Sequence, residues 1–142
     1  MSTALLGLVL LVAGAQAGSD GSNASQLTGT WRGTSTCTDR VAAPACKDET
    51  VVYEFSPGSR GSVHWKADKI VAGKREPMGE LDLTYDTAEA CWKAEFSGPS
   101  VKTVWRLVVS GDQLTGSGRL VPGNQVVRRI EVRRDRARAG RQ

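Results

Sequence analysis

Residues 103–109 read Thr-Val-Trp-Arg-Leu-Val-Val, and this alternation sets the pattern that decides the fold. The odd-numbered side chains, from Thr103 to Val109, lie on one face of a β-strand because successive strand side chains point to opposite faces. The same two-residue period recurs along the chain and predicts several strands of similar length. The other inward faces are predicted to carry Val51, Tyr53 and Phe55; Val63 and Trp65; Leu81, Leu83 and Tyr85; Trp92, Ala94 and Phe96; and Val126, Arg128, Ile130 and Val132.

Turn-forming residues separate these runs, among them Pro57-Gly58, Gly98-Pro99 and Pro122-Gly123. Such pairs favour tight turns because proline fixes φ and glycine accepts a positive φ. Further runs at residues 27–36 and 113–120 bring the predicted number of strands to eight. Beyond the N-terminal apolar run, no segment has the 3.6-residue period of an amphipathic helix. The pattern predicts an all-β, eight-stranded antiparallel up-and-down barrel, with a β-sandwich as the alternative.

The stretch 67–80 interrupts the alternation. It contains charged residues such as Asp68, Lys74 and Glu76, together with Met78. We interpret it as the longest connection of the domain, placed to act as a lid or as a contact loop.

The N-terminus has the features of an export signal. An apolar run from Ala4 to Ala13 precedes Ala15-Gln16-Ala17, whose small side chains suit a signal peptidase, although no basic residue precedes the run. A buried core segment is the alternative interpretation. The run is too short for a transmembrane helix, which needs about 20 apolar residues. We therefore expect cleavage after Ala17 and a periplasmic or extracellular protein without a transmembrane segment.

The predicted organisation follows from these boundaries. Residues 18–26 are rich in Gly, Ser and Asn and are typical of a flexible arm. The segment after Arg134 alternates arginine with small residues and has no apolar period. The chain is thus divided into a signal peptide at 1–17, an arm at 18–26, a barrel domain at 27–134 and a basic disordered tail at 135–142.

Three cysteines are present, and two of them suit a disulfide. Cys37 and Cys46 bracket a turn-like segment that contains Asp39 and Pro44, so in an oxidising compartment they are the predicted pair. Cys91 is then left over, either as a small apolar side chain or as an intermolecular thiol.

The positive charge lies at the C-terminal end. The chain carries a formal charge of +4, and seven arginines from Arg128 onward face only Glu131 and Asp135. A nucleic acid is not an expected partner for an exported chain. Either a solvated tail or contact with an anionic surface accounts for this distribution.

Signals for catalysis are scarce. His64 is the only histidine, which excludes a multi-histidine metal site, and its parity places it on the outer face beside Lys66. Neither a Cys-x-x-Cys pair nor EF-hand spacing is present. We predict no enzymatic activity, no catalytic residues, no metal and no cofactor.

Aromatic residues dominate the predicted interior. The interior of an eight-stranded barrel is either filled by side chains or just wide enough for one small ligand, and both possibilities stay open. A hollow barrel would bind a small apolar or amphipathic ligand. The candidate ligand contacts are Tyr53, Trp65, Tyr85, Trp92 and Trp105.

The segment Gly29-Thr30-Trp31 resembles the Gly-x-Trp opening strand of the lipocalins and their calycin relatives. In that superfamily the tryptophan plugs the closed end of an eight-stranded barrel, and an arginine near the last strand packs across its ring. The resemblance implies these structural roles for Trp31 and Arg128, with Arg129 and Arg133 as alternatives if the register is shifted by one. The chain lacks the central Thr-Asp-x-x motif of the lipocalins.

The chain is also similar in arrangement to small periplasmic protease inhibitors, which combine a barrel, an early tryptophan, a disulfide and an N-terminal arm. The corresponding features here are Trp31, the Cys37/Cys46 pair and residues 18–26. This resemblance implies an alternative function, a protein-binding module such as an inhibitor of an exported hydrolase, whose arm would enter the protease cleft.

Overall fold

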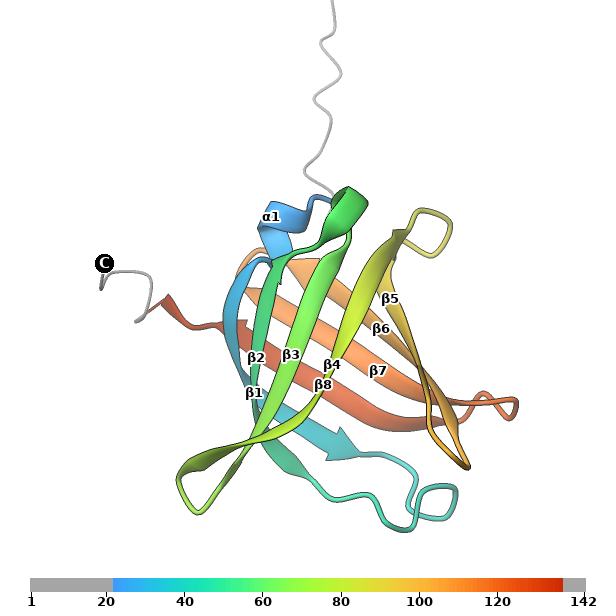
Figure 1. Cartoon of the computed structure of the whole chain (residues 1–142). Coiled ribbons are helices and arrows are strands. Elements are labelled where there is room, and N and C mark those ends of the chain that lie inside the picture. Colours follow the sequence, from blue (N-terminus) through green and yellow to red (C-terminus); the bar gives the residue numbers. More distant parts are fainter. Residues whose placement is uncertain (1–21, 137–142) are drawn as a thin grey trace, which may run out of the picture.

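The computed structural model describes residues 22–136 and confirms the predicted eight-stranded antiparallel barrel. Each strand pairs with the next along the chain, and the last strand pairs with the first, so the sheet closes on itself (Figure 1). A single helical turn, α1 (Ala24–Leu27), precedes the barrel. The strands are β1 (Gly29–Cys37), β2 (Glu49–Pro57), β3 (Val63–Val71), β4 (Lys74–Asp86), β5 (Cys91–Ser97), β6 (Lys102–Ser110), β7 (Gln113–Val121) and β8 (Val126–Arg134), with a 3-10 turn at Ser59–Gly61.

The alternation in the sequence matches the two faces of the barrel wall. On β2, for example, Val51, Tyr53 and Phe55 are all buried in the interior. Because burial of apolar surface is the main favourable term in folding, this inward stripe on each strand stabilises the closed sheet. The interior cluster also contains Leu27, Trp31, Val63, Trp65, Leu83, Trp92, Ala94, Leu107, Leu114, Ile130 and Val132.

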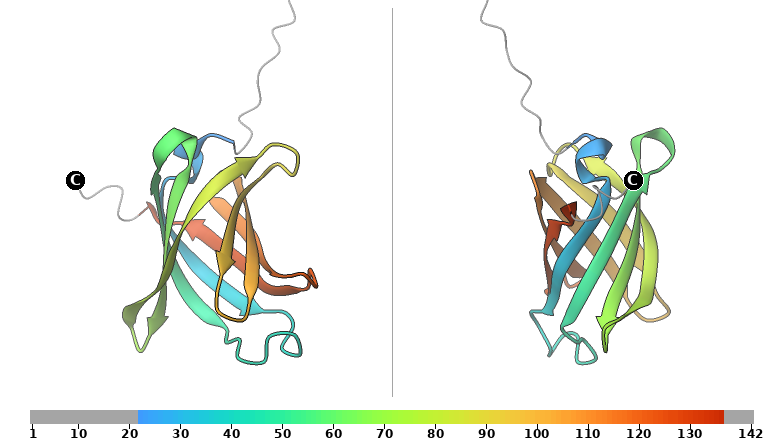
Figure 2. Two further views of the ribbon diagram at one scale, coloured as in Figure 1. Left: turned by 45° about the vertical axis from the view of Figure 1, so that its right-hand side comes forward. Right: turned by 90° about the vertical axis from the view of Figure 1, so that its left-hand side faces the viewer.

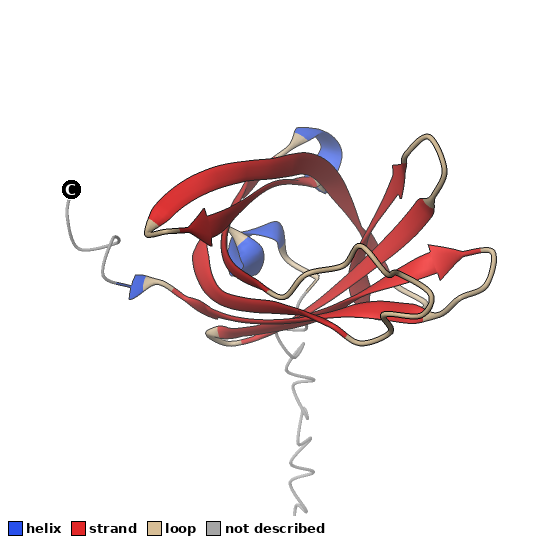
Figure 3. Cartoon of the chain, turned by 90° about the horizontal axis from the view of Figure 1, so that it is seen from below, coloured by secondary structure: helices blue, strands red, loops and turns tan. Residues whose placement is uncertain are grey.

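Trp31 plugs one end of the barrel beneath α1. Its side chain is fully buried, and its Nε1–H donates a 2.8 Å hydrogen bond to the carbonyl oxygen of Leu27. Asn23 caps α1 by accepting a hydrogen bond from the backbone N–H of Ser25. Figure 3 views the barrel from the opposite end and shows α1 across its far end. Residues 24–26, which we expected in a flexible arm, are therefore part of this closed end.

Arg134, and not Arg128, covers Trp31. The Arg134 guanidinium carbon lies 4.4 Å from the centroid of the Trp31 ring. The β1–β8 register pairs Trp31 with Arg134 but Cys37 with Arg128. Both arginines share the inward parity of β8, yet six residues separate them, or about 20 Å along a strand. The role implied for Arg128 is therefore wrong, and Arg129 and Arg133 do not fill it either.

The stretch 67–80 is a β-hairpin and not the expected loop. Pairing between β3 and β4 continues to Val71 and Lys74, with a register shift between Ala67 and Asp68. Ala72 and Gly73 form the turn, with φ values of 49° and 77°. A two-residue turn with positive φ at both positions fits the twist of a hairpin. Figures 1 and 2 show the hairpin turn at the end of the barrel away from α1.

The junction between β4 and β5 is short. These strands pair only at Thr84–Lys93, Tyr85–Trp92 and Asp86–Cys91, whereas every other neighbouring pair is joined at six or more positions. Toward the end opposite Trp31, β4 and β5 diverge (Figure 1). We call this divergence the β4–β5 gap.

The predicted disulfide is present. Cys37 and Cys46 are joined in the loop between β1 and β2, at the end of the barrel opposite α1. The side chain of Asp39 accepts hydrogen bonds from the backbone N–H groups of Val41 and Ala42 within this loop. Cys91 carries a free thiol and is buried.

The first residues of the predicted tail pack on the barrel. Asp135 donates its backbone N–H to the carbonyl oxygen of Thr30, and the side chain of Arg136 pairs with Asp112. The rest of the tail lies outside the described residues. So do the predicted signal peptide at 1–17 and the arm as far as residue 21, on which the inhibitor alternative depends. Within residues 22–136, no helix is long and apolar enough to cross a membrane.

Candidate functional site

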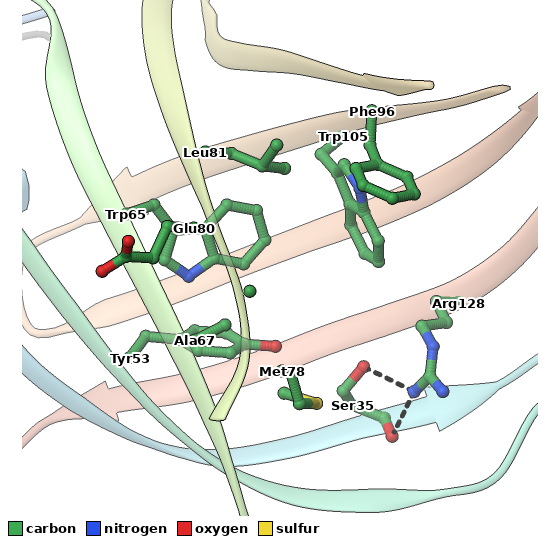
Figure 4. Close-up of a pocket in the computed structure, with 11 residues that line it drawn as sticks. Ser35, Tyr53, Trp65, Ala67, Met78, Glu80, Leu81, Phe96, Trp105 and Arg128 are labelled. Atoms are coloured by element: carbon green, nitrogen blue, oxygen red, sulfur yellow. Dashed lines mark hydrogen bonds between the residues drawn. The ribbon is translucent and has the colours of Figure 1, made fainter. Parts of the chain in front are cut away.

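A cavity of about 240 Å³ lies inside the barrel, on the side away from Trp31. The interior is thus filled at the closed end and hollow toward the other end, which combines the two possibilities left open by the sequence. Figure 4 shows the side chains around the cavity. Its lining residues are Ser35, Tyr53, Trp65, Ala67, Met78, Gly79, Glu80, Leu81, Phe96, Trp105 and Arg128.

Three of the five predicted ligand contacts belong to this cavity. Tyr53, Trp65 and Trp105 line it, from β2, β3 and β6. Tyr85 and Trp92 do not line it. They contact each other edge to face, with ring centroids 5.3 Å apart, where β4 and β5 pair. Trp92 is only 1% exposed, so it fills the core and offers no surface to a ligand.

The aromatic wall of the cavity is a chain of edge-to-face contacts. The rings of Tyr53 and Trp65 are 5.1 Å apart at an interplanar angle of 82°, and those of Trp65 and Trp105 are 5.7 Å apart at 84°. Phe55 stacks on Trp65 from the filled part of the core. Edge-to-face pairs contribute about 0.5–1.5 kcal/mol beyond their area burial, and they hold the rings in fixed orientations. The wall is therefore a preformed apolar surface.

Residues of β4 form the other side of the cavity. Four consecutive residues, Met78 to Leu81, line it. Strand alternation still turns Leu81 toward the core and the carboxylate of Glu80 outward toward His64, and this part of β4 has no partner on its β5 side. The sequence missed Met78 to Glu80 because residues 67–80 were interpreted as a loop. Phe96 stands beside the β4–β5 gap and is 52% exposed.

Arg128 and Ser35 form a polar end of the cavity. Nη1 of Arg128 donates hydrogen bonds to the carbonyl oxygen of Ser35 at 3.2 Å and to its hydroxyl at 2.9 Å (Figure 4). Nη2 donates to the carbonyl oxygen of Lys47 at 2.8 Å. The resemblance to lipocalins implies a place for Arg128 at the closed end, whereas the structure places it in the cavity.

Tyr53 brings a neutral hydroxyl close to this polar end. Burial raises the pKa of Tyr53 to about 12, although the hydrogen bond with Ser35 and the charge of Arg128 act in the opposite direction. At neutral pH the phenol therefore keeps its proton and can donate it to a hydrogen-bond acceptor.

The indole Nε1–H of Trp65 is a buried donor without a hydrogen-bond acceptor among the described residues. Trp65 is only 4% exposed, and its Nε1–H has no hydrogen-bond partner among the described residues. An unsatisfied buried donor costs about 1–3 kcal/mol, so native structures rarely contain one without a reason. Oδ1 of Asp68 and Nη1 of Arg106 are likewise buried without a partner in the described part of the chain, so the unmet donor does not by itself indicate a ligand.

His64 lies away from the cavity, on the outer face, as its parity predicted. Its Nδ1 is 2.9 Å from Oδ1 of Asp82, and its Nε2 is 3.5 Å from Oε1 of Glu80. The hydrogen bond to Asp82 raises the pKa of His64. In the described part of the chain, no three acidic, histidine or cysteine side chains gather closely enough to hold a metal ion.

The geometry thus combines an apolar aromatic wall, the adjoining β4–β5 gap and one cationic end. Comparison with protein-family models, with curated proteins and with solved structures finds no match for this chain.

Proposed function

We propose that this protein is an exported, non-catalytic β-barrel that binds a small apolar or amphipathic molecule in the cavity beside Trp65 and Trp105. The observation that carries the proposal is the hollow itself. The closed end of the barrel is packed around Trp31 and Trp92, whereas the other end keeps about 240 Å³ open against preformed aromatic rings. Concave apolar sites lined by aromatic side chains bind apolar molecules.

The size of the cavity limits the ligand. Sites for drug-sized ligands measure about 300–1,000 Å³, and this one, at about 240 Å³, is smaller. A single ring system or one short acyl chain would fill it, whereas a two-chain lipid would not be enclosed. The half-exposed Phe96 stands where such a ligand would enter through the β4–β5 gap.

Export is the second component of the proposal. The Cys37–Cys46 disulfide is the kind of bond that persists in an oxidising compartment. If residues 1–17 are a signal peptide, the protein recovered from the periplasm or medium of an expressing bacterium begins at Gly18. Intact-mass measurement of the secreted and cytoplasmic fractions tests this, and full-length protein in every fraction would contradict it.

Binding is tested by calorimetry and tryptophan emission with naphthalene, 1-octanol and octanoate as probes. Ala67 lines the cavity, and Ala67→Phe would place a ring in it. The matched control is Lys66→Phe, since Lys66 is exposed on the outer face of the same strand. We expect binding to the wild type and to Lys66→Phe, and a loss of at least 10-fold in Ala67→Phe. If no probe binds the folded wild-type protein, or if the two variants behave alike, the proposal is wrong.

A further inference from the structure

We propose that the polar end of the cavity is a carboxylate site, in which Arg128 binds the head of a small amphipathic acid whose apolar body lies against Trp65 and Trp105. This inference rests on the proposed function and specifies the chemical class of the ligand.

The first step is the uncompensated charge of Arg128. Among the other partly buried arginines, Arg75 pairs with Asp68, Arg106 with Glu89 and Arg134 with Asp112, whereas Arg119, which does not line the cavity, donates to the carbonyl oxygen of Asn124. Arg128 is also partly buried, but within residues 22–136 it forms no ion pair. Its three hydrogen bonds go to neutral oxygen atoms of Ser35 and Lys47. A charge in such surroundings favours an anionic partner.

The second step is the number of free donors. A guanidinium has five N–H groups. Two on Nη1 and one on Nη2 are used by Ser35 and Lys47, so the Nε–H and the second Nη2–H have no partner among the described side chains and backbone groups. Two donors on one planar group suit the two oxygen atoms of a carboxylate.

Hydrogen bonding to Lys47 also gives Arg128 a structural role, because it holds the disulfide loop against β8. That role requires donors but no net charge, so it does not account for an arginine at this position. A further donor borders the same cavity, the neutral hydroxyl of Tyr53. An anionic oxygen at this end would therefore find donors from two strands.

The third step concerns the charge of the ligand. Arg128 is the only cationic residue among those that line the cavity, so a multiply charged anion such as a phosphate monoester would keep an uncompensated negative charge there. A singly charged head with a short apolar body is the chemistry that matches one arginine, an aromatic wall and a cavity of about 240 Å³.

The experiment compares octanoate with 1-octanol, which share their apolar chain and differ in charge. Charge-assisted hydrogen bonds of this type change affinity by about 10- to 100-fold. By calorimetry we expect the wild type to bind octanoate at least 10-fold more tightly than 1-octanol. Arg128→Gln should lose that difference in affinity between the two probes. The control is Arg129→Gln, because Arg129 is the exposed neighbour on the outer face of β8.

The outcomes separate the two proposals. Equal affinity of the wild type for octanoate and 1-octanol, or unchanged octanoate binding in Arg128→Gln, overturns the carboxylate site but leaves the apolar cavity as a ligand site. Absence of binding for both probes overturns the proposed function itself. If Arg128→Gln fails to fold, the wild-type protein still decides, since octanoate and not 1-octanol should shift the Nε–H resonance of Arg128 in ¹⁵N-labelled protein.

Discussion

Arg134 Nη1 donates a 2.7 Å hydrogen bond to the carbonyl oxygen of Thr28, so the last strand of the barrel holds the segment that leads into the first. The same guanidinium donates to the carbonyl oxygen of Gln26 and lies over Trp31. One side chain thus joins the two ends of the barrel domain and seals the plugged end.

We expect Arg134→Ala to lower the free energy of unfolding by about 2–4 kcal/mol, because it removes the cation–π contact and leaves carbonyl groups unpaired. Urea denaturation followed by tryptophan emission measures the change. Arg133→Ala is the control, since Arg133 is exposed, and it should change stability by no more than about 0.5 kcal/mol. Similar losses in both variants would contradict this account.

Loss of the Cys37–Cys46 disulfide should lower stability by about 2–3 kcal/mol, because the bond restricts a loop of about ten residues in the unfolded chain. The double variant Cys37→Ser/Cys46→Ser tests this in urea, alongside the wild type with and without dithiothreitol. The reductant should destabilise the wild type and leave the double variant unchanged. If reduction does not change the stability of the wild type, the disulfide adds nothing to the free energy of unfolding.

The thiol of Cys91 should react slowly in the native protein. Burial raises its pKa, and the neighbouring carboxylate of Glu89 adds to the effect, so little thiolate is present at pH 8. The rate of reaction with a thiol-specific disulfide reagent should rise at least 10-fold in denaturant. Equally fast labelling of the folded chain would show that the site is open.

His64 should titrate above its ordinary value of 6.5, because the hydrogen bond to Asp82 favours the protonated ring. Its small contribution to stability is therefore fully present below pH 6.5 and is lost as the pH rises through the folded-state pKa. The protein has a single histidine, so one imidazole resonance reports the titration in NMR spectra. Asp82→Asn should lower this pKa more than Glu80→Gln, and the reverse order would contradict the assignment.

Gly118→Ala should weaken ligand binding. A Cβ atom at Gly118 would lie 2.8 Å from Cζ3 of Trp105, so the indole would have to move within the cavity wall. Ser117→Ala on the same strand is the control. Calorimetry with octanoate should show lower affinity only for Gly118→Ala, together with a change in tryptophan emission. Equal binding by the two variants would show that the position of Trp105 does not matter to the site.

The wall of the barrel could be predicted from the sequence because burial of one face requires apolar residues at alternating positions. Val51, Tyr53 and Phe55 show this alternation on β2. The hairpin around Ala72 and Gly73 shows no such alternation. Its strands extend past the core, so neither face requires apolar residues, and a loop was the natural interpretation.

The position of a residue along a strand was harder to predict than its face. Parity correctly directed Arg128 inward, but only the pairing of β1 with β8 determines that Arg134, on the same face, meets Trp31. The place of the cavity could not be predicted for the same reason. Trp65 and Trp92 look alike in the sequence, yet one lines the hollow and the other fills the core.

The short junction between β4 and β5 has a consequence for self-association. From residue 74 to residue 83, β4 has no partner on its β5 side, and an exposed row of main-chain donors and acceptors can template the addition of strands from other molecules. Here Pro77 supplies no N–H, the register shift at Ala67/Asp68 bends the hairpin, and Glu76 adds negative charge. The barrel can thus leave this part of β4 unpaired while the edge discourages aggregation.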